Sequence, residues 1–239
     1  MADQPNILLI VSDQHSNQVM GCAGDEVVRT PNLDALAARG TMFDHAQCAA
    51  PLCVPSRMTM LTGRHCSDIA VWSNYCVLRS EIPTFAHALG AAGYETVLCG
   101  RMHFVGPDQR HGFYRRIIGD VSGTMYLAGP APKLSPELLP ATGQSYPAVA
   151  VSGAGRTAYQ AYDEAVGAVA RDFLATRGDE GPLLLVAGFV LPHCPFVARR
   201  ELFDYYYERA DIPPFGYVVD LSLIHISEPT RPLYLSYAV

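Results

Sequence analysis

The sequence predicts an α/β fold in which a mostly parallel central sheet is flanked by helices. Three short aliphatic runs, over residues 6–11, 95–99 and 183–186, have the composition of parallel strands covered on both faces. Helical segments lie between these runs, and no internal repeat is evident. The chain has 239 residues, of which 49% are hydrophobic and 17% charged, which is enough for a substantial core and argues against disorder.

Local signals define the elements in order. The run over residues 6–11 predicts a buried strand. Thr30 and Pro31 are typical of the N-cap and first turn of a helix, which we expect to end at Gly40. The remaining predicted elements are a helix over 84–92, a strand over 95–99, a helix over 158–176 with Tyr162, Val166, Val169 and Phe173 on one face, and a strand over 183–186. Residues 120–157, rich in Gly, Pro, Ser and Ala, predict a long surface excursion.

Composition excludes several classes of function. A net charge of -6 argues against a general nucleic-acid binder. The longest apolar runs, Ile7–Val11 and Leu183–Leu191, are too short to cross a membrane as helices. The N-terminus lacks a basic segment followed by an apolar one, so we expect a cytoplasmic protein whose seven scattered cysteines are reduced.

Polar residues follow each of the three aliphatic runs. Asp13 and Gln14 follow the first, Arg101 and His103 the second, and His193 the third. Ligand sites of parallel sheets lie at the carboxyl ends of the strands, so these side chains predict one site. For each residue alone a structural role is the alternative: Asp13 as a helix cap, and each histidine as a hydrogen-bonded structural residue.

The strongest local signal is the segment Cys53-Val54-Pro55-Ser56-Arg57. Pro55 and Ser56 suit the first turn of a helix, which places Cys53 at the positive end of the helix dipole. Arg57 adds a positive charge four residues later, so we expect a lowered thiol pKa or a bound anion at Cys53. The alternative is a buried structural cysteine.

These motifs resemble those of type I sulfatases, in the alkaline-phosphatase-like superfamily, and are most similar to choline-sulfatase and arylsulfatase members. The pattern C-x-P-S-R from Cys53 to Arg57, followed by a Leu-Thr-Gly that ends at Gly63, is similar to the signature of that family. The other matches are residues 5–14, residues 100–109 with His111-Gly112-Phe113, and His193-Cys194-Pro195, so the resemblance spans residues 5 to 206. One departure is Arg101, where the choline-sulfatase pattern has Lys; Lys133 is the only lysine of this chain.

The resemblance implies a sulfuric ester hydrolase whose nucleophile is formylglycine, made from Cys53 by a maturation enzyme. It also implies a divalent cation, calcium first with magnesium or manganese as alternatives, held by Asp13, Gln14 and the modified residue 53. An oxygen-only ligand set suits such a hard cation.

The remaining roles implied by the resemblance concern the substrate, a small-molecule sulfate ester. Arg57 steadies the modified side chain, and Arg101 and His193 meet the sulfate oxygens. His193 is the candidate proton donor to the leaving alcohol, and His103 the candidate base for the second hydroxyl of the formylglycine hydrate. Asn74 lines the substrate pocket or is a structural loop residue. No nucleic acid or membrane partner is expected, and a homo-oligomer stays open.

Three alternatives remain. The first is a phosphonate or phosphate ester hydrolase of the same superfamily. The second is a thiol hydrolase that uses unmodified Cys53 with a histidine, although Pro55, Ser56 and Arg57 have no role in it. The third is a catalytically inactive, truncated fragment.

The truncated reading comes from the C-terminal part of the sequence. Members of the family complete their metal site with an Asp-Asn or Asp-His pair from a later strand. No such pair follows His193 here, and the only Asp-His dipeptide, Asp44-His45, precedes Cys53. Residues 221–231 resemble a translated sequencing adapter. We therefore expect residues 1–219 to be the N-terminal part of a sulfatase catalytic domain, residues 220–239 to be a non-native tail, and this chain alone to be inactive.

Overall fold

The computed structural model describes residues 4–121, 151–178 and 180–210. These residues form two compact units. The first unit contains residues 4–13, 48–121, 159–178 and 180–190, and the second contains residues 14–47, 151–158 and 191–210. The predicted tail over 220–239 and most of the predicted excursion over 120–157 lie outside the described residues.

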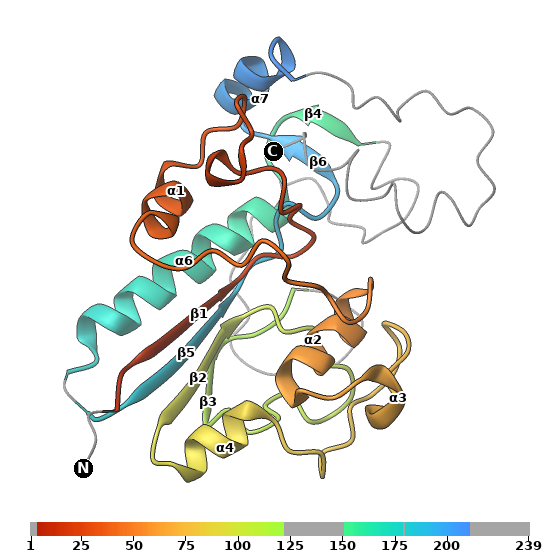
Figure 1. Ribbon diagram of the computed structural model, residues 1–239, viewed down its shortest axis with the longest axis vertical. Coiled ribbons are helices and arrows are strands. Elements are labelled where there is room, and N and C mark those ends of the chain that lie inside the picture. The colour runs from red at the N-terminus through yellow and green to blue at the C-terminus, as the bar shows by residue number, and fades with distance from the viewer. Residues whose placement is uncertain (1–3, 122–150, 179, 211–239) are drawn as a thin grey trace. The chain divides into compact units, whose positions relative to one another are not determined.

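The first unit is built on a four-stranded sheet whose strands all run parallel (Figure 1). The strands, in spatial order, are β1 (Ile7–Val11), β5 (Leu183–Gly188), β2 (Glu95–Gly100) and β3 (Arg115–Ile118). Val11 and Gly100 both pair with Gly188, so β1, β5 and β2 end level with one another. Side chains that follow these strands are therefore brought to one edge of the sheet.

Helices cover the two faces of this sheet, which confirms the predicted α/β class (Figure 1). On one face lie α2 (Cys53–Thr62), α3 (Cys66–Ile69) and α4 (Phe85–Ala91), and on the other lies α6 (Ala158–Thr176). The core under the shorter helices contains Val54, Met58, Leu61, Leu98, Leu184 and Val186. On the apolar face predicted for α6, Tyr162 and Val166 are buried, and Val169 and Phe173 are half-buried.

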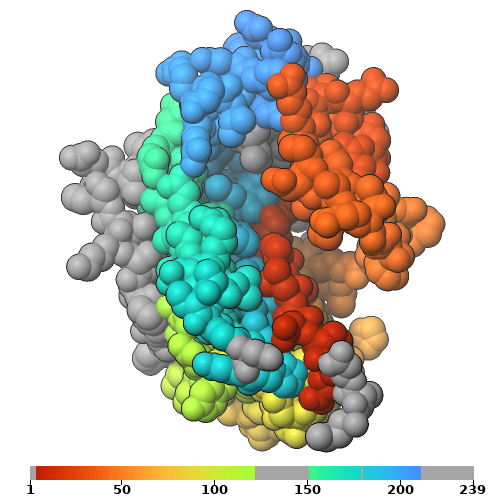
Figure 2. Space-filling model, turned by 90° about the vertical axis from the view of Figure 1, so that its left-hand side faces the viewer, coloured from red at the N-terminus to blue at the C-terminus, as the bar shows by residue number. Residues whose placement is uncertain are grey.

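The strand β1 is not buried on both faces, contrary to the prediction from its aliphatic run. Ile7, Leu9 and Val11 pack against the core, whereas Leu8 and Ile10 are 52% and 61% exposed. Figure 2 shows β1, in red, uncovered beside α6. The reason is topological, because β1 is the outermost strand of the sheet among the described residues, and Val166 of α6 contacts β2.

The second unit contains short elements: η1 (Gly21–Ala23), α1 (Pro31–Ala37), α7 (Arg200–Tyr207) and a two-stranded parallel sheet of β4 (Ser152–Ala154) and β6 (Phe196–Ala198). The helix α1 begins at Pro31 as predicted but ends at Ala37 rather than Gly40. The predicted cap bond from the Thr30 side chain to the helix backbone does not form. Instead, the Thr30 hydroxyl donates to Asp34 Oδ1, at 2.9 Å.

None of the helices in the described ranges is both long and apolar enough to span a membrane.

Two glycines allow the ends of β2 and β5 to approach closely. Gly100 has a φ of +92°, and a Cβ there would collide with the carbonyl oxygen of Gly188. A Cβ at Gly188 would in turn collide with the carbonyl oxygen of Arg101, whose N–H donates to Gly188 O at 2.8 Å. The backbone of Arg101 thus lies where only glycine permits it.

A buried histidine lies beside this sheet. His111 is 1% exposed, the centre of its tilted ring lies 4.6 Å from that of Phe104, and its Nδ1 lies 3.4 Å from Asp108 Oδ2. Burial lowers the pKa of His111 below its usual value, although the Asp108 carboxylate acts in the opposite direction.

The substitution Gly188→Ala tests the close approach. We expect the free energy of unfolding to fall by about 1–3 kcal/mol because the new methyl group forces the Arg101 backbone to move. Urea denaturation followed by circular dichroism measures the change. The matched control is Gly90→Ala in α4, whose Cβ would meet its nearest neighbour at 4.0 Å and which should gain about 0.5–1 kcal/mol. Equal effects of the two substitutions would contradict the argument.

His111 predicts a loss of stability in acid. As pH falls below about 6.5, the unfolded histidine takes up a proton while the folded ring, with its lower pKa, does not. The unfolded state then binds more protons, so the free energy of unfolding decreases until the pH passes the folded pKa. We expect His111→Gln to flatten this decrease between neutral pH and about pH 5. Parallel pH profiles of the two proteins, measured by urea denaturation, would refute the assignment.

Candidate active site

The carboxyl ends of three strands bring a buried ion cluster together. Asp13 follows β1, Arg101 and His103 follow β2, and Asp120 follows β3. All four side chains are buried, with Asp13 6% and Arg101 2% exposed. The prediction that polar residues after β1 and β2 meet at one edge is therefore confirmed for Asp13, Arg101 and His103.

Arg101 is the centre of this cluster. Its Nε donates to Asp13 Oδ2 at 2.6 Å, and its Nη2 lies 3.0 Å from His103 Nδ1. Its Nη1 lies 3.6 Å from Asp120 Oδ1 and has no hydrogen-bond partner. Burial acts to lower the pKa of Arg101, but the Asp13 and Asp120 carboxylates outweigh it and raise the pKa above its usual value.

Asp120 is a site residue that the sequence analysis missed. Its Oδ2 accepts a hydrogen bond of 2.7 Å from the backbone N–H of His103 and lies 3.9 Å from Arg116 Nη2. The missed signal is the one used for the other strands, a polar residue just after a strand end, because Asp120 lies two residues after the strand Arg115–Ile118. That strand was not predicted, since only Ile117 and Ile118 in it are aliphatic.

His103 is held in a strained backbone conformation. Its φ of +58° lies in the left-handed region, which costs a non-glycine residue about 1–3 kcal/mol. An arginine donates and never accepts, so the contact with Arg101 makes His103 Nδ1 the acceptor and leaves the ring proton on Nε2. Burial, aided by the nearby Arg101, lowers the pKa of His103 to about 4, so the ring is neutral at neutral pH. A base needs an unprotonated nitrogen, whereas in this tautomer Nε2 carries the proton and Nδ1 faces Arg101. The role of His103 as a base therefore stays a prediction.

Cys53 is the first residue of α2, as the sequence predicts. The next backbone N–H, of Val54, donates to Asn74 Oδ1 at 3.0 Å, so Asn74 secures the start of the helix. The Cys53 thiol contacts a carboxylate, with Sγ 3.7 Å from Asp13 Oδ1.

The expectation of a lowered thiol pKa at Cys53 is wrong. Burial and then the negative charge of Asp13 raise the pKa, and these two effects outweigh Arg101 and Arg57, which lower it. The thiol-hydrolase alternative loses support, because among the described residues the hydrogen-bond partner of the thiol is a carboxylate rather than a histidine.

Arg57 joins α2 to the strand ends. Its Nη2 donates to Asp13 Oδ2 at 3.2 Å and its Nη1 donates to the carbonyl oxygen of Arg101 at 2.9 Å. Arg57 is 5% exposed, so both bonds are shielded from water. The Asp13 carboxylate therefore accepts hydrogen bonds from two guanidinium groups, those of Arg57 and Arg101.

Gln14 and His193 belong to the second unit. Gln14 is half-buried with a φ of +58°. His193 is 4% exposed, and its Nδ1 lies 2.8 Å from the carbonyl oxygen of Cys194, which only accepts, so the ring proton lies on Nδ1. The first unit holds the other candidates named from the sequence, which are Asp13, Cys53, Arg57, Asn74, Arg101 and His103.

The described residues do not by themselves fit a divalent cation. Calcium takes six to eight oxygen ligands, several of them carboxylates. Among the described residues no group of three or more His, Cys, Asp or Glu side chains converges as a metal site. The Asp13 carboxylate is already bound by Arg57 and Arg101.

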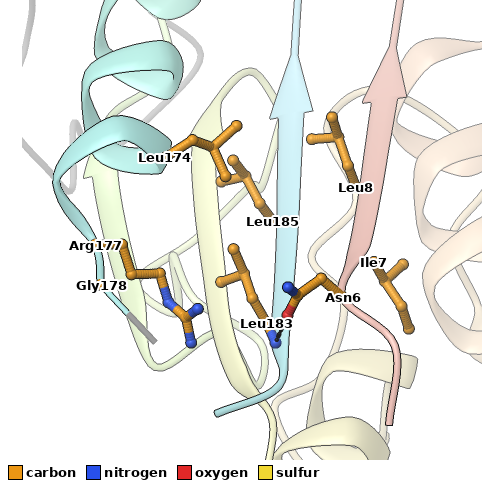
Figure 3. Close-up of a pocket in the computed structure, with 8 residues that line it drawn as sticks. All are labelled: Asn6, Ile7, Leu8, Leu174, Arg177, Gly178, Leu183 and Leu185. Atoms are coloured by element: carbon orange, nitrogen blue, oxygen red, sulfur yellow. Dashed lines mark hydrogen bonds between the residues drawn. The ribbon is translucent and has the colours of Figure 1, made fainter. Parts of the chain in front are cut away.

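A pocket of about 200 Å³ lies at the opposite ends of the strands (Figure 3). Leu8, Leu174 and Leu185 line it together with Asn6, whose Oδ1 accepts from Leu183 N–H at 2.9 Å. It lies near the amino ends of β1 and β5, so it is separate from the ion cluster.

Comparisons with known proteins match this architecture. The family model described as Sulfatase matches residues 5–212. Choline-sulfatase of Rhizobium meliloti (strain 1021) is 34% identical over 218 residues, which is 88% of this chain and 43% of that protein. Steryl-sulfatase of Homo sapiens is 38% identical over 113 residues, or 43% of this chain and 19% of that protein. The chain spans less than half the length of these relatives.

Solved structures share the fold at low sequence identity. BT4656, in complex with its substrate D-glucosamine-2-N,6-O-disulfate, has a TM-score of 0.65 and 21% identity, covering 89% of this chain and 40% of that chain. Phosphonate monoester hydrolase of Agrobacterium radiobacter has a TM-score of 0.62 and 21% identity, covering 84% of this chain and 44% of that chain. At this identity the likeness shows the fold alone.

Asp120→Asn tests the importance of the buried cluster. The amide retains an acceptor for His103 N–H but loses the charge that faces Arg101, so the free energy of unfolding should fall by about 3 kcal/mol or more. The control is Asp204→Asn, an exposed carboxylate 3.6 Å from Arg200 Nη1, for which a change within about 0.5 kcal/mol is expected. If urea denaturation gave both variants the same small change, the cluster would not have the structural role assigned to it.

Proposed function

The chain belongs to the sulfatase family, and on that premise we propose that its first unit carries the nucleophile of a sulfuric ester hydrolase. The proposed reaction cleaves a sulfate ester with water to an alcohol and sulfate. The similarity to a choline-sulfatase across most of the chain supports the sulfate class of substrate.

The observation that carries this proposal is the excess of positive charge beside Cys53. Three buried guanidinium groups, of Arg57, Arg101 and Arg116, face the two carboxylates of Asp13 and Asp120. A bound anion would balance that excess, because buried charges are stable only when they are paired. A sulfate monoester carries one negative charge on its sulfate group and is therefore a suitable ligand.

One hydrogen-bond donor in the cluster is available for such an anion. Arg101 Nη1 is buried and makes no hydrogen bond, and Asp120 Oδ1 at 3.6 Å is too distant to accept one. A sulfate oxygen could accept from this N–H beside residue 53. Burying this N–H without a hydrogen-bond partner costs free energy, and the bond to the sulfate oxygen would offset that cost when the substrate binds.

The position of Cys53 suits a modified nucleophile. Conversion to formylglycine, which the family implies, supplies an aldehyde hydrate whose hydroxyl attacks sulfur and whose second hydroxyl allows the aldehyde to be restored. The N-terminus of α2 favours negative charge on this group. Arg57 and Asn74 hold the helix start in place, the first through Asp13 and Arg101 and the second through Val54 N–H.

His103 and His193 are the proposed proton-transfer residues. The Arg101 contact presents His103 as a donor through Nε2, so it can hold a hydroxyl of the hydrate before any proton moves. His193 is proposed to protonate the leaving alcohol through Nε2, which must first take up a second ring proton because the Nδ1 proton is donated to the carbonyl oxygen of Cys194. The family also implies a divalent cation, with calcium the first candidate and Asp13 and Gln14 its proposed ligands.

The test begins with the modification of Cys53. The full chain is coexpressed with a formylglycine-generating enzyme, and the peptide containing residue 53 is analysed by mass spectrometry. We expect the mass of the aldehyde in place of the thiol, because the segment Cys53–Arg57 matches the family signature. Turnover of an aryl sulfate and of a matched aryl phosphonate is also measured on the modified chain, for which the sequence predicts little or no activity.

The matched control is Cys48→Ala. The Cys48 thiol lies outside the segment Cys53–Arg57 but contacts it, with Sγ 3.0 Å from Ser56 Oγ, and its removal should leave the modification of Cys53 intact. Cys53→Ala should abolish both the aldehyde and any sulfate turnover. Persistence of the free thiol at Cys53 would overturn the proposal, and a preference for the phosphonate would move the assignment to the sister reaction.

A further inference from the structure

Arg116 lies on β3, and its guanidinium group is buried against the segment that follows β2. The side chain is 3% exposed. Its Nη1 donates to Gln109 Oε1 at 2.7 Å and to the carbonyl oxygen of Gln109 at 3.3 Å. Its Nη2 donates to the carbonyl oxygen of Gly100, also at 3.3 Å. One side chain of β3 therefore contacts the first and the last residue of the segment 100–109, which contains His103.

Gln109 binds the middle of the same segment. It is 4% exposed, and its Nε2 donates to the carbonyl oxygens of Phe104, at 3.0 Å, and Gly106, at 2.8 Å. Its Oε1 accepts from Arg116, so both ends of the amide group are hydrogen-bonded. Turning this buried amide would leave polar atoms unpaired, so it is held in one orientation. We call these bonds, from Arg116 through Gln109 to Phe104 and Gly106, the Arg116–Gln109 link.

The backbone of His103 is held on both sides by residues that Arg116 contacts. Before the ring, the N–H of His103 donates to Asp120 Oδ2 at 2.7 Å, and this oxygen lies 3.9 Å from Arg116 Nη2. After it, the carbonyl oxygen of Phe104 accepts from Gln109. The φ of +58° at His103 is unfavourable for a residue with a side chain and persists only where the surroundings determine it. The Arg116–Gln109 link supplies such surroundings.

The position of this backbone decides which ring atom of His103 faces Arg101. Arg101 Nη2 lies 3.0 Å from His103 Nδ1, which must accept, so the ring proton lies on Nε2. Nε2 is the atom that the proposed function assigns to a hydroxyl of the hydrate. If the segment moved, the contact with Arg101 would lengthen, and the proton would be shared between the two ring nitrogens.

We propose that Arg116 and Gln109 are positioning residues, which hold His103 against Arg101 and so keep the ring proton on Nε2. The inference rests on the proposed function for the use made of His103, but the ring position requires neither formylglycine nor turnover. The alternative is that the Arg116–Gln109 link only stabilises the fold. That alternative predicts no change at the His103 ring when the link is removed from a protein that remains folded.

The experiment measures the tautomer of His103 in the full unmodified chain by NMR of the imidazole nitrogens. The spectra are recorded at neutral pH, where a pKa of about 4 leaves the ring neutral, and His103→Gln assigns the signals. Gln109→Met removes the link but keeps the charge of Arg116. It should lower the ratio of the Nε2-protonated to the Nδ1-protonated ring by about fivefold, as expected for the loss of one hydrogen bond. Arg116→Gln should have a similar effect.

Two further variants separate positioning from stability. Arg116→Lys keeps the charge, but one ammonium group cannot bond Gly100 and Gln109 as the guanidinium fork does, so its tautomer ratio should lie between those of the unsubstituted chain and Arg116→Gln. The matched control is Ile69→Ala, a 1% exposed core residue of α3, which should destabilise the fold and leave the tautomer unchanged. Thermal unfolding shows that each variant is folded under the NMR conditions.

An unchanged tautomer in Gln109→Met would overturn the inference, because a change in Arg116→Gln alone is an effect of charge. An unchanged tautomer in Arg116→Gln, an equal change in Ile69→Ala, or a proton on Nδ1 in the unsubstituted chain would overturn it as well. If Cys53 is converted but the tautomer ignores the link, this inference alone fails. If the tautomer responds to the link but Cys53 keeps its thiol, the proposed function alone fails.

Discussion

The buried ion pair between Arg101 and Asp13 is the interaction on which the site depends. It joins the end of β2 to the end of β1, and through Arg57 it fixes the helix that begins at Cys53. Asp120 extends the same network to the end of β3. Each charge lost its hydration on burial, so each must keep a partner, and the four segments are held in one arrangement as a result.

This network is possible because the sheet brings the backbone into unusually close contact. Gly100 and Gly188 leave space for the Arg101 backbone, and His103 adopts a left-handed conformation with its N–H bonded to Asp120. Strain of this kind persists only where the surroundings determine the conformation. The positions of the charged groups are therefore set by the sheet before any ligand binds, which is the condition for electrostatic stabilisation of a reacting anion.

Sequence patterns were sufficient for most of the elements and most of the site residues in the first unit. Helical periodicity located α6 over residues 158–176, and the apolar runs located β1, β2 and β5. Two errors of the sequence-based prediction concern the surroundings of a residue rather than its local structure. The exposure of Leu8 and Ile10 depends on what lies over the sheet, and the position of Asp120 depends on a strand whose composition is too polar to be recognised.

The sequence by itself determined the α/β class, the start of a helix at Cys53 and the presence of Asp13, Arg101 and His103 at strand ends, because these follow from local propensity and from the direction of parallel strands. Only the tertiary structure decided the electrostatic character of the site. The helix end and Arg57 predict a lowered thiol pKa for Cys53, but burial and Asp13 raise it. Desolvation and the distances between charges depend on residues far apart in the chain, so no local pattern contains them.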